Sequence, residues 1–250
     1  TNGRGYLVSP EADGTISLTG AMSYTDVDYE IASHAGDDGK WNLVGNPFPS
    51  YLNMTTSAHA NDNFLTVNEA AIDDTAEFIY AWDGSQYVLY GHNDAYSIEH
   101  IAPGEGFYVY SSADIGNNAT ISFTENMQSS GQGDNFNAVG TIARGSSSGF
   151  SKKVSVFKLE LNDNKNNESD FLKLKFSNQP NVSRGLDPGF DARKFFAGSD
   201  SKVFSRLIED DKGVDFQLQS LPYKDLKDLV LPLGITTKSS SLKLSVVENT

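Results

Sequence analysis

The sequence predicts an all-β protein of two β-sandwich or jelly-roll-like domains, with mostly antiparallel strands. Three observations predict this class. Apolar runs alternate with polar residues at a period of two, which is typical of strands with one buried and one wet face. Turn residues separate these runs at short intervals, no long helix is expected, and the only helix candidate in the N-terminal half is a short piece near Asn68 to Thr75. We therefore expect helix in less than roughly a tenth of the residues.

The first strands belong to a sequence repeat. Residues 3–8 (GRGYLV) match residues 104–109 (GEGFYV), and residues 15–19 (TISLT) match residues 120–124 (TISFT). Each copy predicts an antiparallel hairpin, with an inserted turn around residues 115–118 (IGNN) in the second. A strand follows each Gly-x-Gly, whereas a dinucleotide fingerprint needs a helix there, so the glycines do not indicate a phosphate site.

The next strands lie between the two copies. Residues 41–50 (WNLVGNPFPS) predict a strand whose pairing stops at Asn46, because the proline that follows has no amide donor. Residues 78–82 (FIYAW) and 86–90 (QYVLY) flank Asp83 and Gly84. An Asp-Gly pair between two apolar runs predicts a tight hairpin.

A change of composition predicts the domain boundary. Glycine, serine and asparagine dominate residues 129–151, which we interpret as a loop or linker between an N-terminal domain at 1–128 and a C-terminal domain at 152–250. Alternation is clear again beyond it. The apolar positions of these strands are Leu172, Leu174 and Phe176, Phe216 and Leu218, and Leu242, Leu244 and Val246.

Composition excludes several partners and chemistries. The chain has 19 basic and 33 acidic residues, a net charge of -14, which disfavours nucleic acid and anionic lipid as partners. No apolar stretch approaches the roughly 18 residues of a membrane-spanning helix, so we expect no membrane insertion. The absence of cysteine excludes disulfides, zinc–thiolate sites and cysteine nucleophiles.

No catalytic constellation is predicted, so we do not expect an enzyme. Residues 145–149 (GSSSG) match the nucleophile elbow of hydrolases only formally, because the flanks are loop-like and no histidine follows Ser147. Among 33 acidic residues some pair always resembles a glycosidase dyad, which makes such a pair uninformative. His92, Asp94, Glu99 and His100 cluster in sequence but match no zinc spacing.

Calcium is the one metal that the sequence suggests, so the predicted cofactor is either none or calcium. Residues 163–170 (DNKNNESD) concentrate oxygen ligands on one loop, with Asp163, Glu168 and Asp170 as candidate ligands. The alternative is that asparagine and aspartate simply favour a turn here. A second, weaker candidate comprises Asp26, Asp28, Glu30, Asp37 and Asp38.

The aromatic residues around the Asp83-Gly84 turn suggest a ligand site. Phe78, Tyr80 and Trp82 share one face of their strand, whereas Tyr87 and Tyr90 lie on opposite faces of the next. Exposed rings can pack against the C–H faces of sugars, and the candidate ligand-binding residues are Trp82, Tyr87, Tyr90 and Asp83. Core packing is the alternative, and it is favoured for Phe78 and Tyr80.

Five motifs carry a resemblance over nearly the whole chain. They are residues 41–50, 82–84 (WDG), 101–107 (IAPGEGF), 185–195 (GLDPGFDARKF) and 231–234 (LPLG). Together they resemble the β-rich region that precedes the C-terminal sorting domain of large type IX-secreted surface proteins of Bacteroidota, among them flavobacterial adhesins and polysaccharide-degrading enzymes.

The resemblance implies an extracellular or cell-surface location and other domains of a larger parent protein as partners. It implies no shared catalytic residue. It also implies that further strands follow residue 250, so that the C-terminal domain is incomplete and has an unpaired sheet edge that promotes association.

Three functions remain open. The first is a non-catalytic module that binds polysaccharide or cell-surface glycan. The second is a structural spacer or adhesin stalk without its own ligand, and the third is a fragment of a polysaccharide-active enzyme. Exposed aromatic rings would favour the first function, and a featureless polar surface would favour the second.

Overall fold

The computed structural model describes residues 2–7, 20–36, 38–84, 86–92, 99–130, 136, 154–195 and 200–249. In these ranges 42% of the residues lie in strands and 8% in helices, which confirms the prediction of an all-β, mostly antiparallel protein. The chain forms two compact units. The N-terminal unit contains Thr1–Asp73 and Glu77–Gly145, and the C-terminal unit contains Asp74–Ala76 and Ser146–Thr250. Most of the linker predicted at 129–151 lies outside the described residues.

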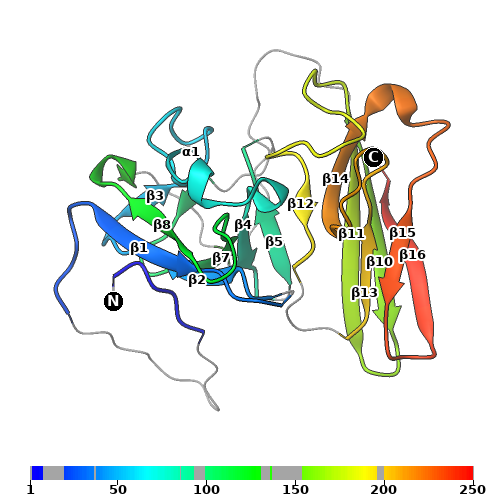
Figure 1. The fold of residues 1–250 in the computed structure, drawn as a ribbon, viewed down its shortest axis with the longest axis horizontal. Helices are drawn as coiled ribbons and strands as arrows, with labels where there is room; N and C mark the ends of the chain where they lie inside the picture. The colour runs from blue at the N-terminus through cyan, green and yellow to red at the C-terminus, as the bar shows by residue number, and fades with distance from the viewer. Residues whose placement is uncertain are drawn as a thin grey trace. The chain divides into compact units, whose positions relative to one another are not determined.

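The largest sheet of the N-terminal unit has four strands. In spatial order they are β2 (Trp41–Gly45), β7 (Gly106–Tyr110), β4 (Ile79–Trp82) and β5 (Tyr87–Tyr90) (Figure 1). β4 and β5 form the predicted hairpin, with Trp82 opposite Tyr87. β2 ends at Gly45, directly before the Asn46-Pro47 step, as predicted.

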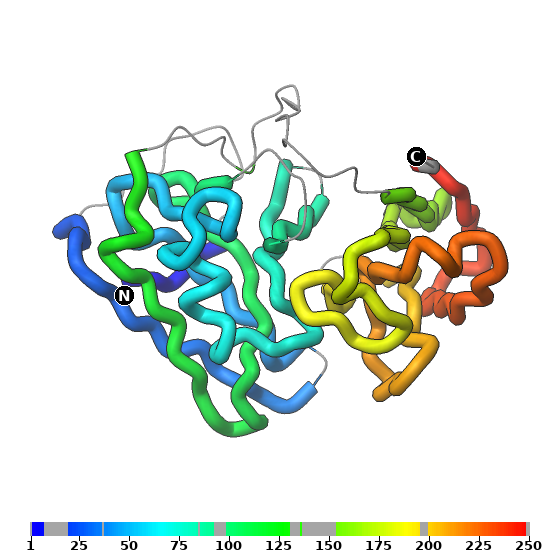
Figure 2. The backbone as a smooth tube through the Cα atoms, turned by 90° about the horizontal axis from the view of Figure 1, so that it is seen from above, coloured from blue at the N-terminus to red at the C-terminus, as the bar shows by residue number. Residues whose placement is uncertain are grey.

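Two smaller sheets and several short helices complete this unit. One sheet pairs β1 (Val27–Ala32) with β8 (Asn118–Phe123), which run side by side in Figure 2. The other has the order β6 (His100–Ile101), β3 (Tyr51–Asn53) and β9 (Gln128–Ser129). The stretch near Asn68 to Thr75, predicted as one helix, contains two short 3₁₀ helices, η1 (Glu69–Ala71) and η2 (Asp74–Ala76), and the α-helix α1 (Phe64–Val67) lies before it. A further 3₁₀ helix, η3 (Glu125–Met127), precedes β9. η2 belongs to the C-terminal unit.

The prediction of a repeated hairpin is wrong in the second copy. β7 pairs with β2 and β4, whereas β8 pairs with β1 in another sheet. The turn between them carries the chain from one sheet to the next, and the amide of Gly116 donates to the carbonyl of Ser33 at 2.7 Å. In the first copy, the Gly5 amide donates to the Leu43 carbonyl at 3.0 Å, and residues 8–19 lie outside the described ranges.

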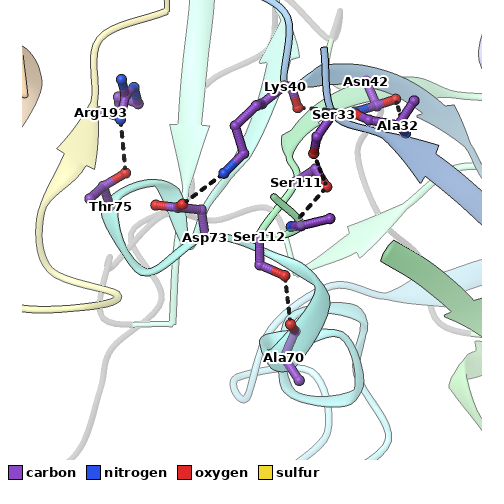
Figure 3. Close-up of polar contacts among 11 residues, drawn as sticks. Ala32, Ser33, Lys40, Asn42, Ala70, Asp73, Thr75, Ser111, Ser112 and Arg193 are labelled. Atoms are coloured by element: carbon purple, nitrogen blue, oxygen red, sulfur yellow. Dashed lines mark hydrogen bonds and ion pairs between the residues drawn. The ribbon is translucent and has the colours of Figure 1, made fainter. Parts of the chain in front are cut away.

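One apolar core joins the three sheets of the N-terminal unit. It contains Ile31 of β1, Val44 of β2 and Leu52 of β3, all fully buried. Polar side chains connect the sheets beside this core, as Figure 3 shows: Asn42 accepts a hydrogen bond from the amide of Ala32 at 3.0 Å and donates to its carbonyl at 2.9 Å. The four-stranded sheet is therefore anchored to the core through one of its faces.

The C-terminal unit is one curled seven-stranded sheet. Its order is β15 (Leu233–Thr236), β13 (Lys202–Ser205), β14 (Phe216–Pro222), β11 (Glu168–Ser177), β10 (Val154–Asp163) and β16 (Leu242–Asn249), with β12 (Ala192–Arg193) also on β14 and η4 (Tyr223–Asp225) after it. β11 and β14 are parallel, and the other pairs are antiparallel. The strands predicted from alternation are all present, and Leu161, Leu172 and Val203 pack together inside the curl.

Candidate functional site

Aromatic side chains gather on the face of the four-stranded sheet that points away from the core. Residues directly opposite each other in paired strands project to the same side. Trp41 lies opposite Tyr110, Tyr80 opposite Tyr108, and Trp82 opposite Tyr87. We call these residues the aromatic row: Trp41, Tyr80, Trp82, Tyr87, Tyr108 and Tyr110.

One end of the aromatic row is closed by packing. The Trp41 ring lies edge-on to Tyr80 and Tyr110, with ring centroids 4.6 Å and 4.8 Å away. The Lys40 ammonium lies 5.2 Å from the centre of the Tyr110 ring and forms an ion pair with Asp73 at 3.3 Å, which Figure 3 shows. Tyr80 and Tyr110 are buried. This end therefore stabilises the sheet and offers little surface to a ligand.

The other end of the aromatic row is open. Trp82 is 46% exposed, and its ring centroid lies 5.1 Å from that of Tyr87. The Tyr87 ring lies 5.8 Å from that of Tyr108, and both tyrosines are half-buried. Burial raises the pKa of Tyr87 to about 12, and the neighbouring Tyr108 hydroxyl adds to the rise. At neutral pH Tyr87 is an uncharged phenol that can donate and accept hydrogen bonds.

The turn between β4 and β5 sets the position of Trp82 and Tyr87. The Asp83 carboxylate accepts a hydrogen bond from the amide of Gln86 at 2.8 Å, and the Asp83 amide donates to the Gln86 carbonyl at 3.0 Å. Gly84 has a φ of 99°, which a residue with a side chain rarely adopts. Asp83 thus shapes the turn that holds the two rings opposite each other.

Not all of the predicted ligand-binding residues lie together. Trp82 and Tyr87 share the open end and Asp83 lies beside them, but Tyr90 lies in the core. Tyr90 is 5% exposed and stacks on Phe136, with ring centroids 5.4 Å apart. Sequence reasoning missed Tyr108, although the alternation of β7 places it on the face opposite Phe107.

Asp163, the first candidate calcium ligand, is surrounded by hydrogen-bond donors. Its carboxylate accepts from the Lys165 amide at 3.0 Å, the Ser201 hydroxyl at 3.1 Å and the Ser239 hydroxyl at 2.9 Å. Burial pushes the pKa of Asp163 up, but hydrogen bonds from Ser239, Asn166 and Lys165 outweigh burial and leave the pKa below its usual range. The carboxylate thus connects, through hydrogen bonds, the segments that contain Lys165, Ser201 and Ser239.

The other two candidate calcium ligands have separate partners. Asp170 forms an ion pair with Lys194 at 2.5 Å and accepts from the Val203 amide at 2.7 Å. Glu168 accepts from the Asp200 amide at 3.1 Å. Within the described ranges, no three or more histidine, aspartate or glutamate side chains form a group that could hold a metal.

The weaker acidic candidates also have donors. Asp28 accepts from the Ser122 hydroxyl at 2.7 Å, and Glu30 accepts from the Asn118 side chain at 3.2 Å. Asp26 accepts from a backbone amide, while Asp38 is exposed. Asp37 lies outside the described residues.

His92 and His100 are the described histidines of the cluster around residues 92–100. Burial lowers the pKa of both His92 and His100, against the raising effect of nearby glutamates. The His92 ring accepts a hydrogen bond from the Thr56 amide at 3.2 Å. Asp94 and the serine-rich residues 145–149 lie outside the described ranges.

The negative charge of the chain is concentrated in its N-terminal part. Residues 1–145 contain 19 acidic and three basic residues, whereas residues 146–250 contain 14 acidic and 16 basic residues. Of the three basic residues, Lys40 is engaged by Asp73. The N-terminal part of the chain is therefore strongly acidic, and a surface of negative charge repels anions.

Comparison with known proteins adds one match. A family model described as "Domain of unknown function (DUF8693)" covers residues 7–246. No curated protein and no solved structure matches the chain. Among the described helices, none is long and apolar enough to cross a membrane.

Proposed function

We propose that this chain, which belongs to the domain family DUF8693, is a non-catalytic module that binds polysaccharide. The proposed binding surface is the open end of the aromatic row. The observation that carries the proposal is the 46% exposed ring of Trp82, held 5.1 Å from Tyr87 by strand pairing. A large apolar ring that remains half in water, on a face rich in other rings, is suited to contact with a ligand.

The chemistry of the open end fits a sugar. A pyranose ring presents an apolar C–H face and a rim of hydroxyl groups. The Trp82 ring supplies a flat apolar surface, and the phenols of Tyr87 and Tyr108 supply polar groups beside it. The rings are held by β-sheet pairing, so little conformational entropy is lost when a ligand binds.

The charge around the open end favours a neutral polymer. The 19 acidic residues of residues 1–145 are opposed by three basic ones, so a sulfated or uronate-rich polysaccharide would be repelled. The expected ligand is therefore a neutral polysaccharide or cell-surface glycan.

The proposed setting is a larger secreted or cell-surface protein of Bacteroidota, in which this module attaches neighbouring domains to glycan. The support is the resemblance of residues 41–50, 101–107 and 185–195 to the region before a type IX sorting domain. Attachment to the polymer would raise the effective concentration of the neighbouring catalytic or adhesive domains near their own targets on the same polymer.

Affinity electrophoresis tests the proposal. The native chain is run through gels that contain β-glucan, xylan, mannan, alginate or a sulfated galactan. We expect retardation by at least one neutral polymer and none by the anionic ones. Trp82→Ala should abolish the retardation at an unchanged melting temperature, because Trp82 lies at the surface.

A matched control removes an exposed ring elsewhere in the same unit. Tyr24 is 62% exposed and lies outside the aromatic row, so Tyr24→Ala should be retarded like the native chain. If no polymer retards the native chain, the structural-spacer function replaces the binding function. If both variants lose retardation equally, the site does not lie at Trp82.

A further inference from the structure

A lysine lies inside the C-terminal unit. Lys194 follows β12 directly, and its side chain is 1% exposed. Lysine is almost never buried to this degree without a partner, because its ammonium loses its hydration. The polysaccharide site does not involve this residue, so its burial has a separate cause.

The hydrogen-bond partners of the Lys194 side chain come from β11, and β13 in turn donates to one of them. Its Nζ lies 2.5 Å from Oδ1 of Asp170 and 3.0 Å from the carbonyl oxygen of Phe171. The second oxygen of Asp170 accepts a hydrogen bond from the amide of Val203 at 2.7 Å. The Phe171 ring lies 5.7 Å from the ammonium. The Lys194 ammonium and the Asp170 carboxylate are thus both fixed in position, with an aromatic ring beside them.

Burial makes the Lys194 ammonium more acidic. Burial lowers the pKa of Lys194, and this effect outweighs the opposing influence of the Asp170 carboxylate. The ammonium of Lys194 therefore loses its proton more readily than that of a solvated lysine. Amide formation needs this loss, because only the uncharged amine is a nucleophile.

We propose that Lys194 and Asp170 condense to form an intramolecular isopeptide bond. One proton passes from Nζ to Oδ1, and the amine then attacks Cγ of Asp170. A second proton passes from nitrogen to Oδ1, the Cγ–Oδ1 bond breaks, and one water molecule leaves. The ammonium and the carboxylate together supply every atom of the amide and the water, so no oxidant, reductant or co-reactant is needed.

The surrounding backbone assists each step. The Phe171 carbonyl accepts a hydrogen bond from Nζ and so holds the amine beside Asp170. The two groups therefore react within one folded chain and do not have to meet by diffusion. The Val203 amide points at Oδ2, where negative charge develops when the amine attacks. The side chain of Lys194 is 1% exposed and that of Asp170 15%, so little water reaches the pair, and hydrolysis of the product is slowed.

Such a bond would give a covalent cross-link to a chain that has no cysteine and so can form no disulfide. It would join β11 to the segment that follows β12 and close the intervening residues into a loop. A covalent link of this kind stabilises the folded state largely by restricting the unfolded chain, as a disulfide does. The inference does not rest on glycan binding, and either one can fail without the other.

Mass spectrometry of the intact, natively purified chain tests the proposal. We expect the mass to lie one water molecule below that of the sequence. Lys194→Met keeps the length of the side chain but removes the amine, so its mass should equal that of its own sequence. Lys238 forms an exposed pair with Asp200 at 3.1 Å, and Lys238→Met should keep the loss of water.

Peptide mapping locates the bond. Trypsin should fail to cleave after Lys194, and fragmentation should show a branched peptide that joins Lys194 to Asp170. An unmodified mass for the native chain would overturn the proposal and leave an ordinary buried ion pair. A loss of water traced to another position, such as a succinimide at Asp83 before Gly84, with the amine of Lys194 intact, would overturn it equally.

Discussion

The indole ring of Trp82 lies edge-on to the phenol ring of Tyr87, with ring centroids 5.1 Å apart and an interplanar angle of 62°. The two residues face each other across the β4–β5 hairpin, and Tyr108 of β7 extends the same surface from a third strand. Three rings from three strands therefore form the open end of the aromatic row. Their spacing depends on strand pairing and not on a flexible loop.

The first prediction concerns Tyr87 and alkaline pH. The pKa of Tyr87 is raised from 10.0 to about 12, so its contribution to stability is complete below about pH 10 and is lost as pH rises toward 12. Melting temperature should therefore fall over this window in the native chain and fall less in Tyr87→Phe. Equal alkaline losses in both proteins would contradict the assignment.

The second prediction concerns Asp191, which is fully buried in the C-terminal unit. Burial raises its pKa to about 8, although the amides of Ser220 and Asp187 donate to its carboxyl oxygens at 2.7 Å and 2.8 Å and favour the charged form. The folded state holds the proton more tightly than the unfolded state. This group therefore makes the free energy of unfolding decrease as pH rises from about 4 to about 8, by an amount on the order of a few kcal/mol.

Urea denaturation at the two ends of this window measures the effect. Asp191→Asn cannot titrate, so the part of the pH dependence that comes from Asp191 should disappear, together with some stability at acidic pH. Asp210 is exposed and serves as a control, because Asp210→Asn should keep the pH dependence of the native chain. A native-like slope in Asp191→Asn would show that another group is responsible.

The third prediction concerns calcium and Asp163. Because hydroxyl and amide donors already occupy its carboxylate, we expect the same melting temperature in millimolar calcium and in chelator. The depressed pKa of Asp163 predicts that its contribution to stability is present near neutral pH and is lost as pH falls through the acidic range. A calcium-dependent rise in melting temperature that vanishes in Asp163→Asn would restore the calcium hypothesis.

The fourth prediction concerns the edge of the curled sheet. β16 is the last strand of that sheet, and Leu244 and Val246 on it are 43% and 59% exposed. An apolar edge strand can pair with another chain, and a lysine on an edge discourages such pairing. Val246→Lys should therefore reduce concentration-dependent association in size-exclusion chromatography. Association that is unchanged in Val246→Lys would exclude this edge as its cause.

Local sequence patterns were sufficient to predict strand pairing where the two paired strands are close in the chain. The Asp83-Gly84 turn predicts the β4–β5 hairpin because its two strands are adjacent, and alternation at Leu172 to Phe176 predicts β11. The hairpin predicted for the second repeat fails because β7 and β8 find partners far away in the chain. Alternation identifies a strand but does not select its neighbour.

The same limit explains why only part of the candidate site could be predicted from the sequence. Trp82 and Tyr87 could be predicted together because one tight turn joins them. Tyr108 reaches them only through the pairing of β4 with β7, which no short pattern specifies. The face of Tyr90 follows from its position in the strand, but its burial depends on Phe136, which comes from a distant part of the chain.

Tryptophan fluorescence tests the central claim most directly. The chain has two tryptophans, so Trp41→Phe leaves Trp82 as the only reporter and keeps an aromatic ring at the closed end of the row. We predict that titration with the neutral polymer found by electrophoresis shifts the Trp82 emission to the blue and saturates, because the indole leaves water when a sugar covers it. Emission that does not change while the polymer still retards this variant would place the binding surface elsewhere and contradict the account.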